Sequence, residues 1–172
     1  MPSLAFLQSN EAEAIGFTKE LKKRKADLSE YATSSDGLKY LDLSVGSGDE
    51  VSKGQRVTVH FDCIYKGINV VSSRQARLLG GNRTISEPFE FTAGDVVSGV
   101  AVKKISDSAN GLFAGSGGPK PPSALGTAVL GMRVGGKRSV IVPPEVGYGA
   151  TGLQEIPPNG TFEMRVEVLQ VG

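Results

Sequence analysis

The chain of 172 residues is long enough for one well-buried core and an appendage. Its 19 Lys and Arg against 18 Asp and Glu leave a formal net charge of +1, so nothing in the charge predicts a nucleic-acid or anionic-membrane partner. No apolar run has the length that spans a bilayer, and no embedded membrane segment is expected. One cysteine, Cys63, and one histidine, His60, cannot build a disulfide or a structural zinc site, so we expect no metal and no other cofactor.

Residues 10–30 have the apolar periodicity of a helix. Asn10 is a candidate N-cap with an acidic residue three positions on, and apolar residues recur on one face. The basic run at 22–25 covers much of the opposite surface and is either a solvated helix face or a contact for an acidic partner. We expect residues 1–35 to form an N-terminal helical extension ahead of one domain over residues 36–172.

From Ser34 onward the segments are short and separated by glycine, which favours antiparallel strands with tight connections. The clearest strand is 56–65, where Val57, Val59, Phe61 and Cys63 alternate onto one face. On this face Cys63 is expected to be a packed, inert thiol, whereas His60 on the other face is expected to be structural or exposed. Further strands are predicted over 38–45, 88–91, 137–142 and 162–171.

Residues 101–122 break this rhythm. The segment is rich in Gly, Ser and Pro and has neither the apolar alternation of a strand nor the apolar spacing of a helix. It therefore predicts a long irregular surface loop inserted in the domain. Ser123 is then a candidate N-cap for a short helix that ends before Gly131. Together these elements predict an α+β fold, in which a curved antiparallel sheet covers one short helix.

The usual catalytic motifs are missing from the sequence. One histidine without a positioned partner does not support a Ser-His-Asp site. No nucleophile elbow, phosphate-binding loop or dinucleotide fingerprint is present, and the carboxylates are too scattered to suggest a glycosidase pair. Ordinary acid–base and metal-dependent enzymes are therefore disfavoured.

The segment GMRVGGKRSVIVPPEVGYGATG at 131–152 resembles the FKBP family, the tacrolimus-binding peptidyl-prolyl cis-trans isomerases. The resemblance extends from Asp36 to Val171 and includes VHF at 59–61, SSR at 72–74, PFEF at 88–91, VV at 96–97 and IPP at 156–158. It implies an FKBP-like fold and rotation about X–Pro bonds in an apolar pocket without a cofactor. The N-terminal extension, the strand VHFDCIYKGI, the insertion and LQEIPPN are similar to plant and algal members of the chloroplast thylakoid lumen, which implies that location.

The resemblance assigns site residues position by position. Tyr148 matches the tyrosine whose hydroxyl bonds a ligand carbonyl, and Val97 matches the residue whose backbone N–H binds the ligand. The expected substrate-binding residues are Phe61, Val70, Phe89, Val96, Leu125, Ile156 and Met164. Plain core packing is the alternative for each, and it is least favoured for Tyr148, which is flanked by glycines.

Several positions depart from the family's pocket. Leu125, or else Val100, stands where the floor tryptophan is expected, Phe61 replaces a tyrosine, Val70 and Val71 replace an aromatic residue and an aspartate, and Met164 replaces an aromatic wall. Aromatic walls bury large areas, so their loss predicts weak or undetectable isomerase activity and poor tacrolimus binding.

Three functions remain open on these residues. The first is a peptidyl-prolyl isomerase that assists folding of lumenal proteins, acting as a monomer on proline-containing polypeptides. The second is a non-catalytic binding or assembly module for a thylakoid lumen protein complex, using the N-terminal helix, the insertion or the pocket rim. The third is a chaperone that uses Leu112 and Phe113 of the insertion as an apolar patch.

Overall fold

The computed structural model describes residues 26–74, 77–79, 83–85, 88–97 and 120–172. By its internal contacts the chain divides into two compact units, Met1–Tyr31 and Ala32–Gly172. In the first unit the structure describes a 3₁₀ helix, η1 (Leu28–Glu30). The rest of the helix predicted over 10–30 lies outside the described residues, as does most of the insertion, including Leu112 and Phe113.

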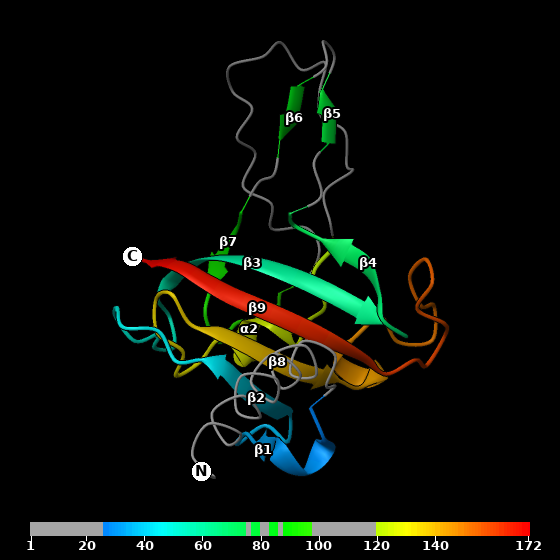
Figure 1. Ribbon diagram of the computed structural model, residues 1–172, viewed down its shortest axis with the longest axis horizontal. Coiled ribbons are helices and arrows are strands. Elements are labelled where there is room, and N and C mark those ends of the chain that lie inside the picture. The colour runs from blue at the N-terminus through cyan, green and yellow to red at the C-terminus, as the bar shows by residue number, and fades with distance from the viewer. Residues whose placement is uncertain (1–25, 75–76, 80–82, 86–87, 98–119) are drawn as a thin grey trace, which may run out of the picture. The chain divides into compact units, whose positions relative to one another are not determined.

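The second unit is built on a seven-stranded sheet in which every strand pairing is antiparallel (Figure 1). The order is β1-β2-β8-β9-β3-β4, and β7 pairs with β3. The strands are β1 (Ala32–Thr33), β2 (Lys39–Ser44), β3 (Arg56–Tyr65), β4 (Ile68–Ser72), β7 (Phe89–Thr92), β8 (Lys137–Val142) and β9 (Phe162–Val171). A separate two-stranded sheet consists of β5 (Arg77–Leu79) and β6 (Arg83–Ile85).

Three of the predicted strands, β3, β8 and β9, have the predicted bounds, and β2 and β7 differ from theirs by one residue at each end. The short strands β1, β4, β5 and β6 were not predicted. The hairpin between β3 and β4 turns at Lys66 and Gly67, both with positive φ (49° and 81°), which is the geometry of a two-residue hairpin turn. Lys is an uncommon residue at such a position, so the sequence pattern did not reveal the turn.

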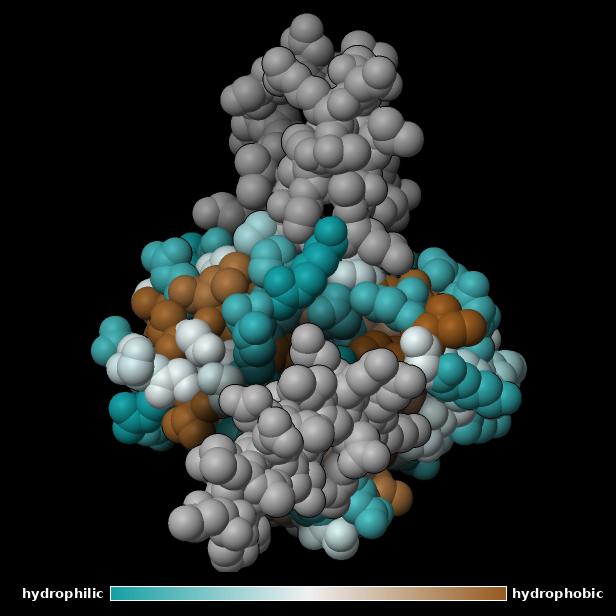
Figure 2. Space-filling view, viewed as in Figure 1, coloured by the Kyte–Doolittle hydropathy of each residue, from teal (hydrophilic) through white to brown (hydrophobic). Residues whose placement is uncertain are grey.

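The centre of the sheet is β3, which pairs with β9 along most of its length. Val57, Val59, Phe61 and Cys63 on its inner face are fully buried, as their alternation predicts. The opposite face carries half-buried polar residues, and Figure 2 shows mostly hydrophilic colours where Figure 1 places the middle of β3 and β9. This alternation puts the hydrophobic core on one side of the sheet.

The core is closed on that side by one turn of helix, α2 (Leu125–Ala128), which Figure 1 shows behind β8 and β9. The predicted N-cap was wrong: the cap residue is Ala124, and no side chain caps the helix. Ser123 Oγ donates instead to the carbonyl of Val146 (2.9 Å), which also accepts the N–H of Ala124 (2.9 Å). This acceptor comes from the end of another 3₁₀ helix, η2 (Pro144–Val146), so it could not be read from the local sequence.

Two residues fix α2 against its neighbours. Gly126 allows close backbone approach, because a Cβ there would lie 1.9 Å from the carbonyl oxygen of Asp95. Arg138 is 8% exposed and donates to both carboxylate oxygens of Asp42 and to the carbonyls of Ala128 and Leu130 (3.0 Å each). The helix is thereby held at its start by close packing and at its end by hydrogen bonds.

Candidate functional site

Tyr148 lies in the glycine-rich loop that follows η2, and its ring is half-buried. The ring stacks on Phe162 of β9, with centroids 5.2 Å apart and an interplanar angle of 22°. Gly147 makes this packing possible, because a Cβ there would lie 2.9 Å from the Phe162 ring and 3.0 Å from the carbonyl oxygen of Pro143. Gly147 therefore serves to bring the tyrosine onto the sheet.

The Tyr148 hydroxyl takes part in a short chain of polar contacts. It donates to the carbonyl of Lys120 (2.6 Å) and lies 3.6 Å from Cys63 Sγ. Since the phenolic proton is used on Lys120, the Cys63 thiol is left to donate to the phenolic oxygen. The contacts thus run from thiol to hydroxyl to backbone carbonyl, and each donor polarises the next.

Burial keeps both of these groups protonated. It raises the pKa of Cys63 to about 12 and, together with the nearby thiol, raises the pKa of Tyr148 above its ordinary value of 10.0. At neutral pH Tyr148 is therefore an uncharged donor, which suits an amide carbonyl as its acceptor. Cys63 is buried and protonated, which agrees with the inert thiol expected from its strand position.

The other predicted site residues, apart from Val96, belong to one buried hydrophobic cluster, and Tyr148 packs against it. Phe61 and Phe89 meet edge to face, with centroids 5.9 Å apart. Three of the predicted site residues in this cluster, Phe61, Leu125 and Met164, are each 0% exposed, and we call these three the floor. The cluster also contains Val70, Phe89, Val97 and Ile156.

Val96 and Val97 have opposite environments. Val96 is 80% exposed and lies outside the buried cluster, and its predicted role as a wall of the substrate site stays a prediction. Val97 is buried, and one of its methyl carbons would lie 3.3 Å from a Cβ on Gly126, which places it against α2. Its predicted role as a backbone N–H donor to a ligand stays a prediction. Val100 lies outside the described residues.

Ile156 is brought into the cluster by a tight turn. Leu153 and Ile156 exchange two backbone hydrogen bonds, each 2.9 Å long, and Gln154 between them has a φ of 52°. A Cβ on Gly152 would lie 2.4 Å from the Ile156 carbonyl oxygen, so this turn needs the glycine. Ile156 itself is buried, as a residue packed under a loop would be.

The SSR motif joins β4 to β3. Ser73 Oγ accepts the N–H of Phe61 (2.9 Å) and lies 3.0 Å from His60 Nδ1. Burial and the positive charge of Arg74 lower the pKa of His60, so the imidazole is neutral at pH 7. The ring is thus part of a structural network on the sheet, and Arg74 extends that network by pairing with Asp62.

Three partners of Tyr148 were not identified from the sequence as site residues: Cys63, Phe162 and Lys120. The first two lie on the apolar faces of predicted strands, and Cys63 pairs across the sheet with Met164. The third lies at the end of the predicted insertion, which was expected to be a surface loop. In the part of it that the structure describes, Pro121 and Pro122 are buried, so that expectation was wrong for these residues.

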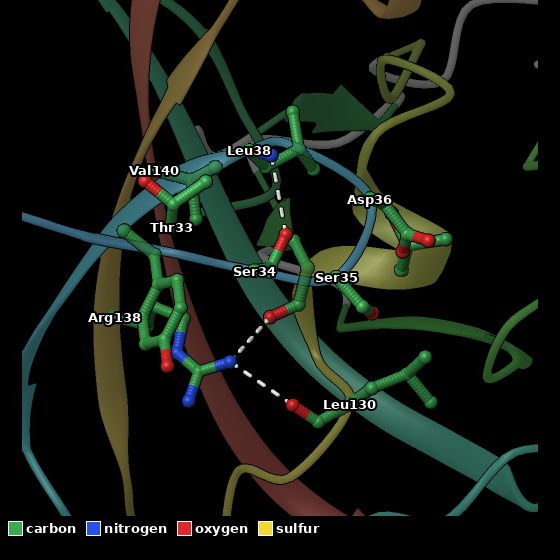
Figure 3. Close-up of a pocket in the computed structure, with 11 residues that line it drawn as sticks. Thr33, Ser34, Ser35, Asp36, Leu38, Leu130, Arg138 and Val140 are labelled. Carbon is green, nitrogen blue, oxygen red and sulfur yellow. Dashed lines mark hydrogen bonds between the residues drawn. The ribbon is translucent and has the colours of Figure 1, made fainter.

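A cavity of about 270 Å³ lies next to the end of α2, between the turn after β1 and Arg138 (Figure 3). Ser34 at its rim accepts the N–H of Leu38 (3.1 Å). None of the predicted site residues lines it. Within the described residues, no group of three or more His, Cys, Asp or Glu side chains could hold a metal ion, and no helix could cross a membrane.

Comparison with protein families matches residues 48–169 to the family described as FKBP-type peptidyl-prolyl cis-trans isomerase. Two Arabidopsis thaliana relatives are named as chloroplastic peptidyl-prolyl cis-trans isomerases. FKBP18 is 46% identical over 89% of this chain and 66% of its own length, and FKBP16-4 is 39% identical over 96% and 62%. The chain therefore spans slightly less than two thirds of these relatives.

A more distant Arabidopsis thaliana relative is named photosynthetic NDH subunit of lumenal location 4, chloroplastic. It is 27% identical over 84% of this chain and 58% of its own length. Among solved structures, AtFKBP13 matches with a TM-score of 0.50 and 25% identity, over 83% of this chain and 99% of that one. With its curved antiparallel sheet, the short helix α2 packed against it and a sequence match over most of its length, the chain belongs to the FKBP-type peptidyl-prolyl cis-trans isomerase family.

Proposed function

We propose that this chain binds X–Pro peptides at Tyr148 and accelerates rotation about the amide bond, with low turnover. The observation that carries the proposal is the position of the Tyr148 hydroxyl, a neutral, half-buried donor beside an apolar floor. The substrate is a proline-containing segment of a polypeptide, and the chain acts as a monomer.

Such a site needs no acid, base or metal. Resonance between the nitrogen lone pair and the carbonyl creates a barrier of about 18–20 kcal/mol to amide rotation. In the twisted amide this resonance is lost, the nitrogen becomes less positive, and an apolar surface becomes a better environment for it. A site that binds the twisted form more tightly than either planar form lowers the barrier. Tyr148 would hold the carbonyl next to the proline, and the apolar cluster against which Tyr148 packs would supply the surface for the ring.

Low turnover follows from the composition of the floor. Leu125 and Met164 offer aliphatic and thioether surface where the family has aromatic walls. Replacing several aromatic contacts costs a bound proline about 1–3 kcal/mol, or about one to two powers of ten in rate.

The alternative is a non-catalytic binding or assembly module for a protein complex of the thylakoid lumen. The replaced walls favour it, and so does a relative that is named as a lumenal subunit of a photosynthetic complex. The chloroplastic names of the other relatives support a location in the chloroplast. In this alternative the N-terminal segment, for which a helix is predicted, would be available as a second contact.

A cis/trans assay without a coupling protease, using a short X–Pro peptide, tests the proposal. Tyr148→Phe keeps the ring that stacks on Phe162 and removes only the hydroxyl. Loss of one hydrogen bond of about 1–1.5 kcal/mol should lower kcat/KM about tenfold. Tyr65→Phe is the matched control, because it removes a hydroxyl from a partly buried tyrosine at the end of β3 and should leave the rate unchanged.

Two results would contradict the proposal. If wild type and Tyr148→Phe are equally active, rotation does not take place at Tyr148. If wild type does not exceed the uncatalysed rate while an active FKBP does, the binding-module alternative replaces the isomerase.

A further inference from the structure

The carbonyl that accepts the Tyr148 hydroxyl belongs to an X–Pro peptide bond of the chain itself. Lys120 directly precedes Pro121, and the Tyr148 hydroxyl donates to the Lys120 carbonyl at 2.6 Å. The Lys120 side chain is exposed, whereas Pro121 is buried. An exposed residue, a bonded carbonyl and a buried proline ring are the arrangement that an X–Pro ligand would have in this site.

The rest of this segment is held firmly in place. Pro122 is also buried, and its carbonyl accepts the N–H of Leu125 (3.1 Å), the first residue of α2. Immediately after it, Ser123 and Ala124 both donate to the carbonyl of Val146, two residues before Tyr148. Lys120 therefore reaches Tyr148 from the side of α2, and the same short segment carries both Lys120 and Leu125.

The hydrogen bond from Tyr148 to Lys120 also uses the hydroxyl proton that a substrate carbonyl would need. A phenol has one proton to donate, and that proton is directed at Lys120. The thiol of Cys63, 3.6 Å away, can only strengthen this donation, because it is buried and stays protonated. An external peptide carbonyl can therefore bind Tyr148 only after the Lys120 carbonyl has left.

We propose that the Lys120–Pro121 segment is an intramolecular ligand of the Tyr148 site, and that external X–Pro peptides bind in competition with it. This inference rests on the proposed function, since it assigns an occupant to the same site. It adds a second cause of low turnover, because only the fraction of molecules with the segment displaced can accept a substrate. If that fraction is about one tenth, the apparent Kd of a peptide is raised about tenfold.

The test is a fluorescence binding titration with the labelled peptide Gly-Pro-Lys-Pro-Pro-Ser, which copies residues 118–123. Pro121→Ala removes the ring and its fixed φ and should weaken the internal ligand. It is expected to bind the peptide about tenfold more tightly than wild type. Pro122→Ala is the matched control: this proline is also buried, but the carbonyl before it is not the acceptor of Tyr148, so the Kd should stay within about twofold.

A second measurement uses the unaltered chain, which keeps the test valid if Pro121→Ala does not fold. The protein is labelled with ¹³C at its lysine carbonyls and tyrosine rings. Added unlabelled peptide should then shift the NMR signals of Lys120 and Tyr148, and both shifts should give the same Kd. A shift of Tyr148 with no change at Lys120 would overturn the inference.

The outcomes separate the inference from the function. Equal binding by wild type and Pro121→Ala, with both weakened by adding Tyr148→Phe, overturns the intramolecular ligand and leaves the peptide site intact. Tighter binding by Pro121→Ala with no rate enhancement in any variant supports the intramolecular ligand and overturns the isomerase. No peptide binding by any variant, with no shift at Lys120, overturns both.

Discussion

The floor and the Tyr148 end of the site are held together by different forces. The side chains of Phe61, Leu125 and Met164 in the floor are fully buried and held by packing, whereas the Tyr148 side chain is half-buried and bonded to an exposed residue, Lys120. Packing inside a core cannot be exchanged without opening the fold, but a hydrogen bond at the surface can be exchanged with a ligand. The comparison teaches that the floor carries stability and the Tyr148 end carries ligand exchange.

Truncating the floor should have the largest effect on stability. Met164→Ala removes a fully buried side chain and is expected to lower the free energy of unfolding by about 2–5 kcal/mol. Met164→Leu conserves volume and should cost less than about 1.5 kcal/mol. Urea unfolding followed by circular dichroism measures both. A cost below about 1 kcal/mol for Met164→Ala would break the comparison, because it would show that the floor is not tightly packed.

A substitution in α2 should give the next largest effect on the free energy of unfolding. In an ordinary helix Gly→Ala is stabilising, by about 0.8–1.0 kcal/mol. At Gly126 the added Cβ would lie 1.9 Å from the Asp95 carbonyl oxygen, so Gly126→Ala should instead destabilise by about 1–3 kcal/mol.

Thr127→Ala at the next position of α2 is the matched control for Gly126→Ala. Thr127 is half-buried, and its replacement should change the free energy of unfolding by no more than about 0.5 kcal/mol in the same urea titration. Stabilisation by Gly126→Ala would mean that α2 can move away from the loop at Asp95. The floor would then be less fixed than its burial indicates.

The smallest effect concerns Cys63, which touches both regions. Its pKa is raised from 9.0 to about 12 in the folded protein, so its contribution to stability is complete below pH 9 and is lost as pH rises from 9 towards 12. Unfolding of wild type should therefore become easier between pH 8 and pH 10, and by a larger amount than unfolding of Cys63→Ala. Urea titrations at these two pH values measure the change. If wild type and Cys63→Ala lose the same free energy of unfolding between them, the thiol is less buried than the structure indicates.

Alternation and glycine spacing were sufficient to predict five of the seven strands of the main sheet. A strand such as 56–65 buries every second residue, and this requirement is written locally in its apolar pattern, so β3, β8 and β9 could be predicted to the residue. The resemblance of an ordered series of motifs then identified the family and nominated Tyr148 and the buried cluster. Short strands such as β4 were missed because five residues next to an uncommon turn carry too little pattern.

By itself, the sequence determined strands β2, β3, β7, β8 and β9, their buried faces and the family, because periodicity and motifs are local properties of the chain. Only the tertiary structure decided that Tyr148 meets Cys63, 85 residues away, and Lys120, 28 residues away. It also decided that Ser123 bonds Val146 instead of capping α2, and that Val96 is exposed beside a buried Val97. Each of these depends on where a distant carbonyl, ring or backbone comes to lie, and no local pattern encodes that position.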